Sequence, residues 1–183
     1  MDQVAKAVRE AGGQIVHAPS DTMDFYAESP ARKRAIETPQ VELPPDIERA
    51  DPPLPIDDSD QGSDTGETET HKAWHRQHAA IAIDEEWDII TDKGTEVYSY
   101  LQHRGIEHLL ILGVHSNMCV LHRTFAIKQM VRWGVDVALI RDLTDAMYNP
   151  AMPPYVGHAE GTGLVIEFIE KFWCPSVLSD DLL

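Results

Sequence analysis

Cysteine is scarce in this chain. Only two of its 183 residues are cysteines, Cys119 and Cys174, and they form neither a CxxC pair nor the spacing of a zinc finger. This scarcity excludes a disulfide-rich secreted scaffold and a cysteine-ligated zinc module. Free thiols are typical of cytoplasmic proteins, so we expect both cysteines to be reduced.

Long apolar runs are also missing. No stretch approaches the roughly 20 residues that a membrane-spanning helix needs. The start of the chain, residues 1–9, is amphipathic and carries acidic as well as basic side chains, unlike a signal peptide. We therefore expect a cytoplasmic protein without a membrane partner.

Basic residues are few. Lys and Arg together number 15 against 31 Asp and Glu, which gives a formal net charge of −16. Nucleic acids and anionic membrane surfaces bind basic patches, so this balance argues against both kinds of partner. The length predicts one domain over residues 1–183, with a Pro- and Asp-rich segment at 42–70 that is typical of a long loop.

Helical and strand-like patterns alternate along the rest of the chain. Helices are predicted where apolar residues recur at helical spacing, and strands where short apolar runs occur. The predicted helices are 2–11, 31–36, 96–104, 119–133 and 161–172, and the predicted strands are 14–17, 79–83, 88–91, 108–114 and 135–140. This alternation is typical of a three-layer α/β/α sandwich, Rossmann-like, with a mainly parallel sheet.

Cys119 stands at the turn between a predicted strand, 108–114, and a predicted helix. The strand is apolar and short, so we expect it to be buried on both faces. Unpaired N–H groups and the helix dipole at such a turn favour a thiolate and can hold an oxyanion. The position favours Cys119 as a nucleophile, although a lone cysteine is more often a small buried apolar residue.

Other polar residues follow the predicted strands. In a parallel sheet, ligands bind at the carboxyl ends of the strands. His17, Ser20, Asp21 and Tyr148 are expected there, and the candidates for substrate binding are His17, Asp21, Asn117 and Tyr148. For Tyr148 the alternative is a turn closing before Pro150, and His158 either caps the last helix or faces the same pocket.

The run Gly113-Val-His-Ser-Asn-Met-Cys-Val120 closely resembles the nucleophile loop of the isochorismatase-like cysteine hydrolases, which include nicotinamidases and N-carbamoyl amide hydrolases. The similarity continues through Gly134 and the strand 135–140. It implies that Cys119 is the nucleophile and that the amides of His115 and Cys119 form an oxyanion hole. It also implies a cis peptide bond between Val114 and His115.

Two members of that family's Asp, Lys and Cys triad are not evident. The family's Asp follows a central strand that precedes the first helix. Since this chain opens with that helix, we expect the strand and its Asp to be absent, through a truncated or mis-started reading frame, with a genuine start at Met1 as the alternative. The lysine position falls near Glu86; the nearest lysine, Lys93, is the candidate catalytic lysine, with a solvated turn residue as its alternative. Lys72 is a second candidate.

A metal site is an open alternative. Some relatives bind a divalent ion through Asp and His, and the residues here with suitable chemistry are His17, Asp21, His71, His75 and His78. No compact ligand motif joins them, and each histidine is otherwise an ordinary polar loop residue. We therefore expect no cofactor, with zinc as the alternative.

The resemblance implies a hydrolase that cleaves a C–N bond of a small amide or carbamoyl substrate through a cysteine nucleophile and a covalent acyl intermediate. It also implies a homo-oligomer. The alternative, suggested by the missing Asp and uncertain Lys, is a catalytically impaired family member that acts as a small-ligand-binding or interaction subunit.

Overall fold

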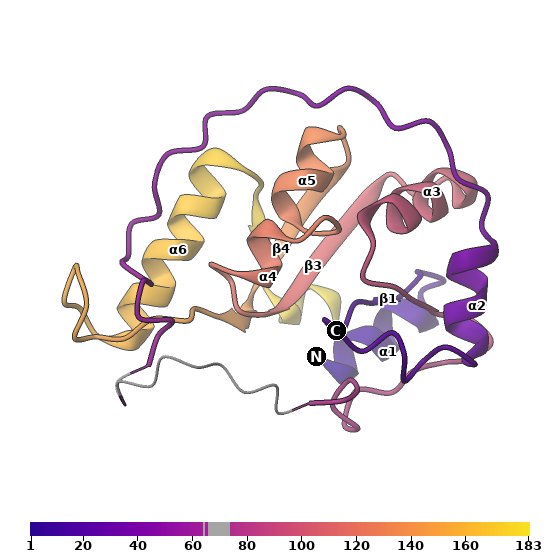
Figure 1. Cartoon of the computed structure of the whole chain (residues 1–183), viewed down its shortest axis with the longest axis horizontal. Helices are drawn as coiled ribbons and strands as arrows, with labels where there is room; N and C mark the ends of the chain where they lie inside the picture. The colour runs from indigo at the N-terminus through magenta and orange to yellow at the C-terminus, as the bar shows by residue number, and fades with distance from the viewer. Residues whose placement is uncertain (64, 66–73) are drawn as a thin grey trace.

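The structure, a computed structural model, describes residues 1–63, 65 and 74–183. The candidates His71 and Lys72, and most of the last part of the predicted loop, lie outside the described residues. The elements are α1 (Asp2–Glu10), β1 (Val16–His17), α2 (Pro30–Glu37), β2 (Ile89–Ile90), α3 (Gly94–Arg104), β3 (His108–Val114), α4 (Cys119–His122), α5 (Ile127–Arg132), β4 (Asp136–Asp145), α6 (His158–Phe172), β5 (Ser176–Val177) and the 3₁₀ helix η1 (Ser179–Leu182) (Figure 1).

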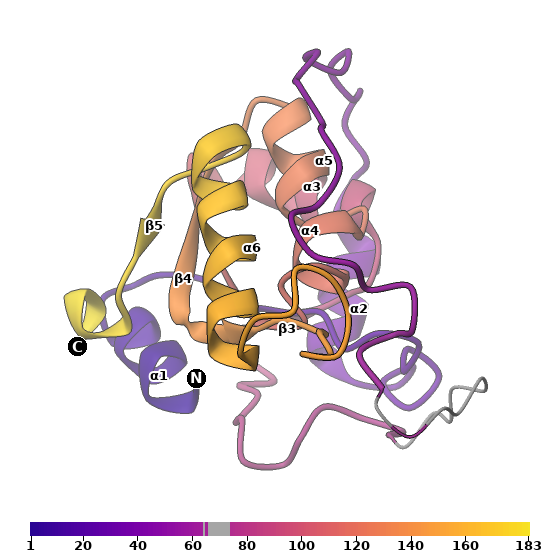
Figure 2. The same ribbon diagram turned by 90° about the vertical axis from the view of Figure 1, so that its left-hand side faces the viewer.

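The described strands form two parallel sheets. One pairs β1 with β2, and the other has the order β3-β4-β5. Helices pack against both, so the chain has the predicted three-layer α/β fold. In Figure 2, α6 runs alongside β4, and α1 lies close to η1 at the other end of the chain.

The main core lies between the three-stranded sheet and the helices α3 to α6. Its fully buried side chains include Leu139 of β4, Ile127 of α5 and Ile169 of α6. A smaller apolar cluster joins α2, β2 and α3 through Ala35, Ile89 and Tyr100. Within the described part of the chain, no helix is long and apolar enough to cross a membrane.

Two predicted elements are wrong. Residues 79–83 form a turn followed by irregular backbone rather than a strand, and the helix predicted over 119–133 is two short helices, α4 and α5. The break between them places Thr124 against the start of α3, where its Oγ1 accepts a hydrogen bond from the Gly94 amide at 3.0 Å. A tertiary contact, which helical periodicity does not report, therefore ends α4 early.

The prediction that residues 108–114 are buried on both faces is also wrong. None of the seven residues of β3 is fully buried, and the exposed fractions of Leu110 and Val114 are 38% and 54%. β3 is the edge strand of its sheet in the described structure, so one side of its backbone has no neighbouring strand. The apolar composition of β3 is typical of a central strand, but at the edge of the sheet its side chains are not fully covered by neighbouring elements.

A long segment without helix or strand, residues 41–63, crosses from α3 to α6; we refer to it as the strap. Figure 1 shows it arching over the helices. The Ile47 amide donates to the Arg132 carbonyl at 2.8 Å, Asp51 forms an ion pair with Lys128, and Ile56 is buried in the main core. This part of the predicted loop is thus fixed along its length.

Candidate active site

Cys119 is the first residue of α4, at the carboxyl end of β3. The preceding loop opens with a cis peptide bond between Val114 and His115, as predicted. The His115 carbonyl accepts hydrogen bonds from the amides of Met118 at 3.0 Å and Val120 at 3.2 Å. This tight turn places the half-buried thiol at the sheet edge where ligands bind in parallel folds.

The polar surroundings of Cys119 come from two segments. The Ser20 hydroxyl donates to the Cys119 Sγ at 3.8 Å. The Arg123 guanidinium also lies beside the thiol, and this proximity raises the pKa of Arg123 against the opposing effect of partial burial. Arg123 Nη2 also lies 3.5 Å from Asp21 Oδ2. A hydroxyl and a guanidinium therefore adjoin the thiol, and a carboxylate adjoins the guanidinium.

The backbone of the nucleophile loop has donors to spare. Among residues 1–63, 65 and 74–183, the amides of His115 and Cys119 donate no hydrogen bond, while the Ser116 amide is held by the Asp145 carbonyl at 2.8 Å. Unpaired amides beside a nucleophile are the groups from which oxyanion holes are built. The two amides that the motif singled out therefore have the chemistry this role requires.

The loop that carries Ser20 and Asp21 follows β1. It is fixed by the Trp74 indole, which donates to the Ser20 carbonyl at 3.0 Å, and by the Thr22 hydroxyl, which donates to the Pro19 carbonyl at 2.8 Å. Asp21 has a φ of 56°, in the left-handed region. The sequence predicted Ser20 and Asp21 at the carboxyl ends of the strands. In the structure Ser20 contacts the Cys119 thiol, and Asp21 pairs with Arg123, which lies beside that thiol.

Arg123 was missed by the sequence analysis. A signal for it was present, because Arg123 is four residues after Cys119, and side chains four apart lie on the same face of a helix. Its contact with the thiol makes it the cation of the site.

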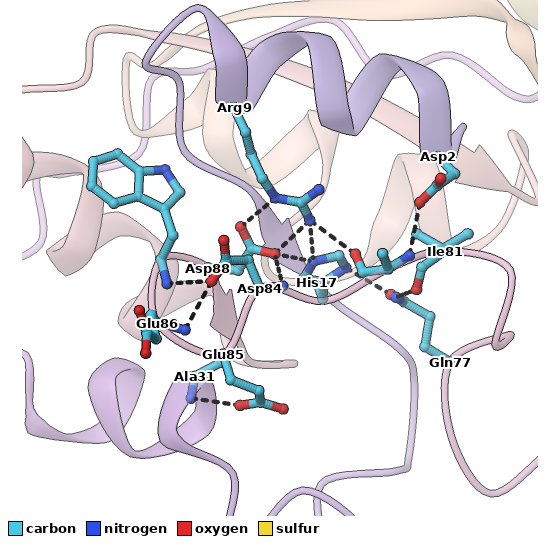
Figure 3. Close-up of polar contacts among 12 residues, drawn as sticks. Asp2, Arg9, His17, Ala31, Gln77, Ile81, Asp84, Glu85, Glu86 and Asp88 are labelled. Atoms are coloured by element: carbon cyan, nitrogen blue, oxygen red, sulfur yellow. Dashed lines mark hydrogen bonds and ion pairs between the residues drawn. The ribbon is translucent and has the colours of Figure 1, made fainter.

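His17 lies in a different polar cluster (Figure 3). Its side chain is almost fully buried, with Nδ1 2.9 Å from Gln77 Oε1 and Nε2 2.9 Å from Asp88 Oδ2. Arg9 of α1 also binds the Asp88 carboxylate through its Nε. Both ring nitrogens of His17 thus have protein partners, so the residue ties β1 to its neighbours.

Asp88 is the centre of that cluster. Burial alone would raise its pKa, but hydrogen bonds from His17, Arg9 and the Asp84 amide outweigh burial and lower the pKa to about 2. A buried carboxylate of this kind is stable only when its partners compensate for lost water. It anchors the framework from which the Ser20 loop leaves.

Asn117 and Tyr148, two other predicted substrate-binding residues, are buried. The Asn117 side chain bonds the backbone of Met147 through both its oxygen and its nitrogen. The Tyr148 hydroxyl donates to the Met152 carbonyl at 2.8 Å, and its ring packs on Gly161. The structure therefore gives both side chains partners within the protein, close behind the nucleophile loop.

The candidate lysine Lys93 is exposed at the start of α3. Its Nζ lies 3.6 Å from Glu96 Oε1, and its side chain is 62% exposed. In the described structure it makes no contact with Cys119. Glu86, at the family's lysine position, is exposed as well.

An Asp–His pair stands at the end of β4, where Asp145 lies opposite Val114 in the sheet register. His158 Nε2 is 2.9 Å from Asp145 Oδ1, and His158 Nδ1 is 2.9 Å from the Tyr148 carbonyl. Both ring nitrogens face acceptors, which raises the pKa of His158. His158 was predicted either to cap the last helix or to face the pocket. Among the described residues no side chain caps α6, and His158 instead pairs with Asp145 at the carboxyl end of β4.

Of the residues named for the metal alternative, the structure describes His17, Asp21, His75 and His78. No group of three His, Cys, Asp or Glu side chains within them is placed to hold a metal ion. His75 and His78 are exposed, and the ring of His17 is occupied by Gln77 and Asp88.

Comparison with known proteins gives one kind of similarity. No family model and no curated protein matches the sequence. The fold is similar to that of a cysteine hydrolase from Pseudomonas syringae pv. phaseolicola 1448A, whose crystal structure is known, with a TM-score of 0.58, 16% identity, and coverage of 98% of this chain and 75% of that chain. At this identity the similarity establishes a shared fold and no more.

Proposed function

We propose that this chain is a hydrolase of the isochorismatase-like kind, which cleaves a C–N bond of a small amide or carbamoyl compound with Cys119 as the nucleophile. The observation that carries the proposal is the place of Cys119 as the first residue of α4, in the turn that follows the cis peptide bond, with the Ser20 hydroxyl 3.8 Å from its sulfur. The fold shared with a cysteine hydrolase supports it.

In the first step, the thiolate of Cys119 attacks the acyl carbon, and the carbonyl electrons move to the oxygen. The amides of His115 and Cys119 hold this oxyanion. When it collapses, the C–N bond breaks and leaves a thioester on Cys119. The carboxylate of Asp21 holds the proton that the thiol gave up and passes it to the nitrogen, so the amine leaves neutral.

In the second step, water attacks the thioester carbon. The C–S bond breaks, the acid leaves, and the proton from water returns to the thiol. Arg123 stabilises the sulfur as a leaving thiolate in this step, just as it favours the thiolate in the first. Ser20, in contact with the sulfur, fixes its position.

The experiment is a panel of small amides and carbamoyl amines, with amine and acid products measured for the wild type and for Cys119→Ser. Serine is close to cysteine in size, so the variant should fold with nearly the same stability. We expect turnover of at least one compound by the wild type, a mass increase on Cys119 during turnover, and loss of both in the variant.

Alkylation of the wild type by iodoacetamide should abolish turnover in parallel with labelling of Cys119. Equal turnover by the wild type and Cys119→Ser would contradict the proposed nucleophile. Absence of turnover across the panel would contradict the hydrolase assignment.

One observation favours the alternative function, a small-ligand-binding or interaction subunit without catalysis. Lys93 pairs with Glu96 instead of the thiol, so a cysteine–lysine arrangement is not formed by the described residues. Compounds from the same panel that raise the melting temperature without being turned over would support this alternative, since a ligand that binds only the folded state stabilises it.

A further inference from the structure

The buried side chain of Asn117 ties the nucleophile loop to the neighbouring backbone and to the strap. It is only 1% exposed and lies two residues before Cys119. Its Oδ1 accepts from the Met147 amide at 2.8 Å, and its Nδ2 donates to the Met147 carbonyl at 3.1 Å and to Asp58 Oδ2 at 2.8 Å. The primary amide has two N–H donors, and both are used.

Asp58 is a residue of the strap, 59 positions away in the sequence. The strap is itself fixed on either side of it. The amide of Asp57, the residue before Asp58, donates to the Pro153 carbonyl at 2.9 Å. Ile56, two residues before Asp58, is buried in the main core. Asp60 then binds Asn149 Nδ2 at 2.8 Å. The Asp58 carboxylate is thus a fixed acceptor presented to the nucleophile loop.

We propose that Asp58 is a positioning residue for the nucleophile: it orients the Asn117 amide and thereby the loop that sets Cys119 against Arg123. A charged acceptor makes a stronger hydrogen bond than a neutral one, and the Asn117 side chain that donates to Asp58 is buried. Met147 alone fixes Asn117 along one edge of its amide group, and Asp58 fixes the remaining N–H.

The consequence concerns reactivity more than stability. A displacement of about 1 Å at a reacting group can cost on the order of a hundredfold in rate. A loop freed at Asn117 shifts Cys119 relative to Arg123 and to the oxyanion amides. For turnover this inference rests on the proposed function, but the reactivity of the Cys119 thiol tests it separately.

The test compares Asp58→Ala and Asp58→Asn with a control, Asp60→Ala, which removes a hydrogen bond of the same strap to Asn149. The readout is the rate of iodoacetamide labelling at Cys119, resolved from Cys174 by peptide mass spectrometry. We expect Asp58→Ala to slow labelling about tenfold, Asp58→Asn to slow it less because an amide oxygen still accepts, and Asp60→Ala to stay within about twofold.

Melting temperatures identify variants that fail to fold, in which case Asp58→Asn alone decides. Labelling that is unchanged or faster in the folded Asp58 variants would overturn the proposal, and so would equal slowing by Asp60→Ala. Where the wild type turns over a substrate, kcat should fall in Asp58→Ala with KM nearly constant. If the wild type turns over none, the proposed function fails while the labelling comparison still decides the role of Asp58.

Discussion

At the scale of single residues, the two cysteines of the chain have opposite surroundings. Cys119 is half-buried and in contact with the Arg123 guanidinium, whereas Cys174 is only 5% exposed. Burial raises the pKa of Cys174 to about 12, so at pH 7 about one molecule in 10⁵ carries its thiolate. Neighbouring groups, more than the thiol itself, decide which cysteine reacts.

We therefore expect iodoacetamide at neutral pH to label Cys119 at least about a hundredfold faster than Cys174, because burial closes off Cys174 and raises its pKa to about 12. Peptide mass spectrometry of a labelling time course measures both rates in one sample. Unfolding the chain in denaturant should remove the difference, and equal rates in the folded protein would contradict an activated thiol.

The guanidinium itself can be tested by Arg123→Gln. Loss of an ion pair near the surface is worth about 1 kcal/mol, so we expect labelling of Cys119 to slow about fivefold. Arg76→Gln is the matched control, because Arg76 stacks on the Phe25 ring, 5.8 Å from its centroid. A control variant as slow as Arg123→Gln would show that the effect is one of net charge.

Sequence reasoning at this scale found the residues that follow a local rule. Cys119, the cis peptide bond after Val114 and the edge position of Ser20 come from a motif and from strand ends. Arg123 was obscured because the predicted helix was treated as continuous and only its apolar face was considered. The partners of Asp88 lie 71 and 79 positions away, which no local pattern reports.

At the scale of elements, α3 closely approaches the segment between α4 and α5. A Cβ on Gly94 would lie 1.8 Å from the backbone oxygen of Thr124, so only glycine fits there. This contact also explains why the predicted helix divides. Helical spacing predicted where helices form, but the tertiary contact determined where one of them ends.

Gly94→Ala should therefore destabilise the fold by about 3 kcal/mol, a value typical of severe overpacking. Gly163→Ala in α6 is the control: nothing lies within 4 Å of its Cβ position, and alanine favours a helix by up to about 1 kcal/mol. Denaturant unfolding measures both. Similar midpoints for the two variants would mean that α3 moves away from Thr124 at little cost.

The Asp88 cluster joins three elements, through Arg9 of α1, His17 of β1 and the start of β2. The pKa of Asp88 is lowered from 3.8 to about 2. Asp88 therefore stabilises the folded state at a pH above its pKa in the unfolded chain, and this contribution is lost as the pH falls toward 2. The contribution is about 2 kcal/mol at neutral pH, from a shift of nearly two units.

We expect Asp88→Asn to lower the free energy of unfolding at pH 7 by about 3 kcal/mol. The variant leaves Arg9 and His17 in place without the carboxylate that compensates for their burial. The free energy of unfolding of the wild type should fall more steeply between pH 5 and pH 2 than that of the variant. Parallel pH dependences would show that Asp88 does not titrate with a lowered pKa.

At the scale of the whole molecule, two opposing features bear on association. β3 is an edge strand with exposed apolar side chains, and unpaired edges of this kind bind other strands. The net charge of −16 makes copies of the chain repel each other. Salt screens that repulsion while leaving the apolar edge unchanged, since the Debye length falls to about 3 Å at 1 M salt.

We accordingly propose that the chain forms homo-oligomers through the β3 edge and predict that association increases with salt concentration. Leu110→Lys should weaken it by placing a charge on that edge. Leu43→Lys is the matched control, because Leu43 on the strap is exposed to nearly the same extent, 37% against 38%, and the added charge is the same. Sedimentation velocity in low and high salt compares the three proteins. A monomer under all conditions would mean that exposure of β3 does not drive association. Equal weakening by both variants would mean that the added charge, and not its position on β3, weakens association.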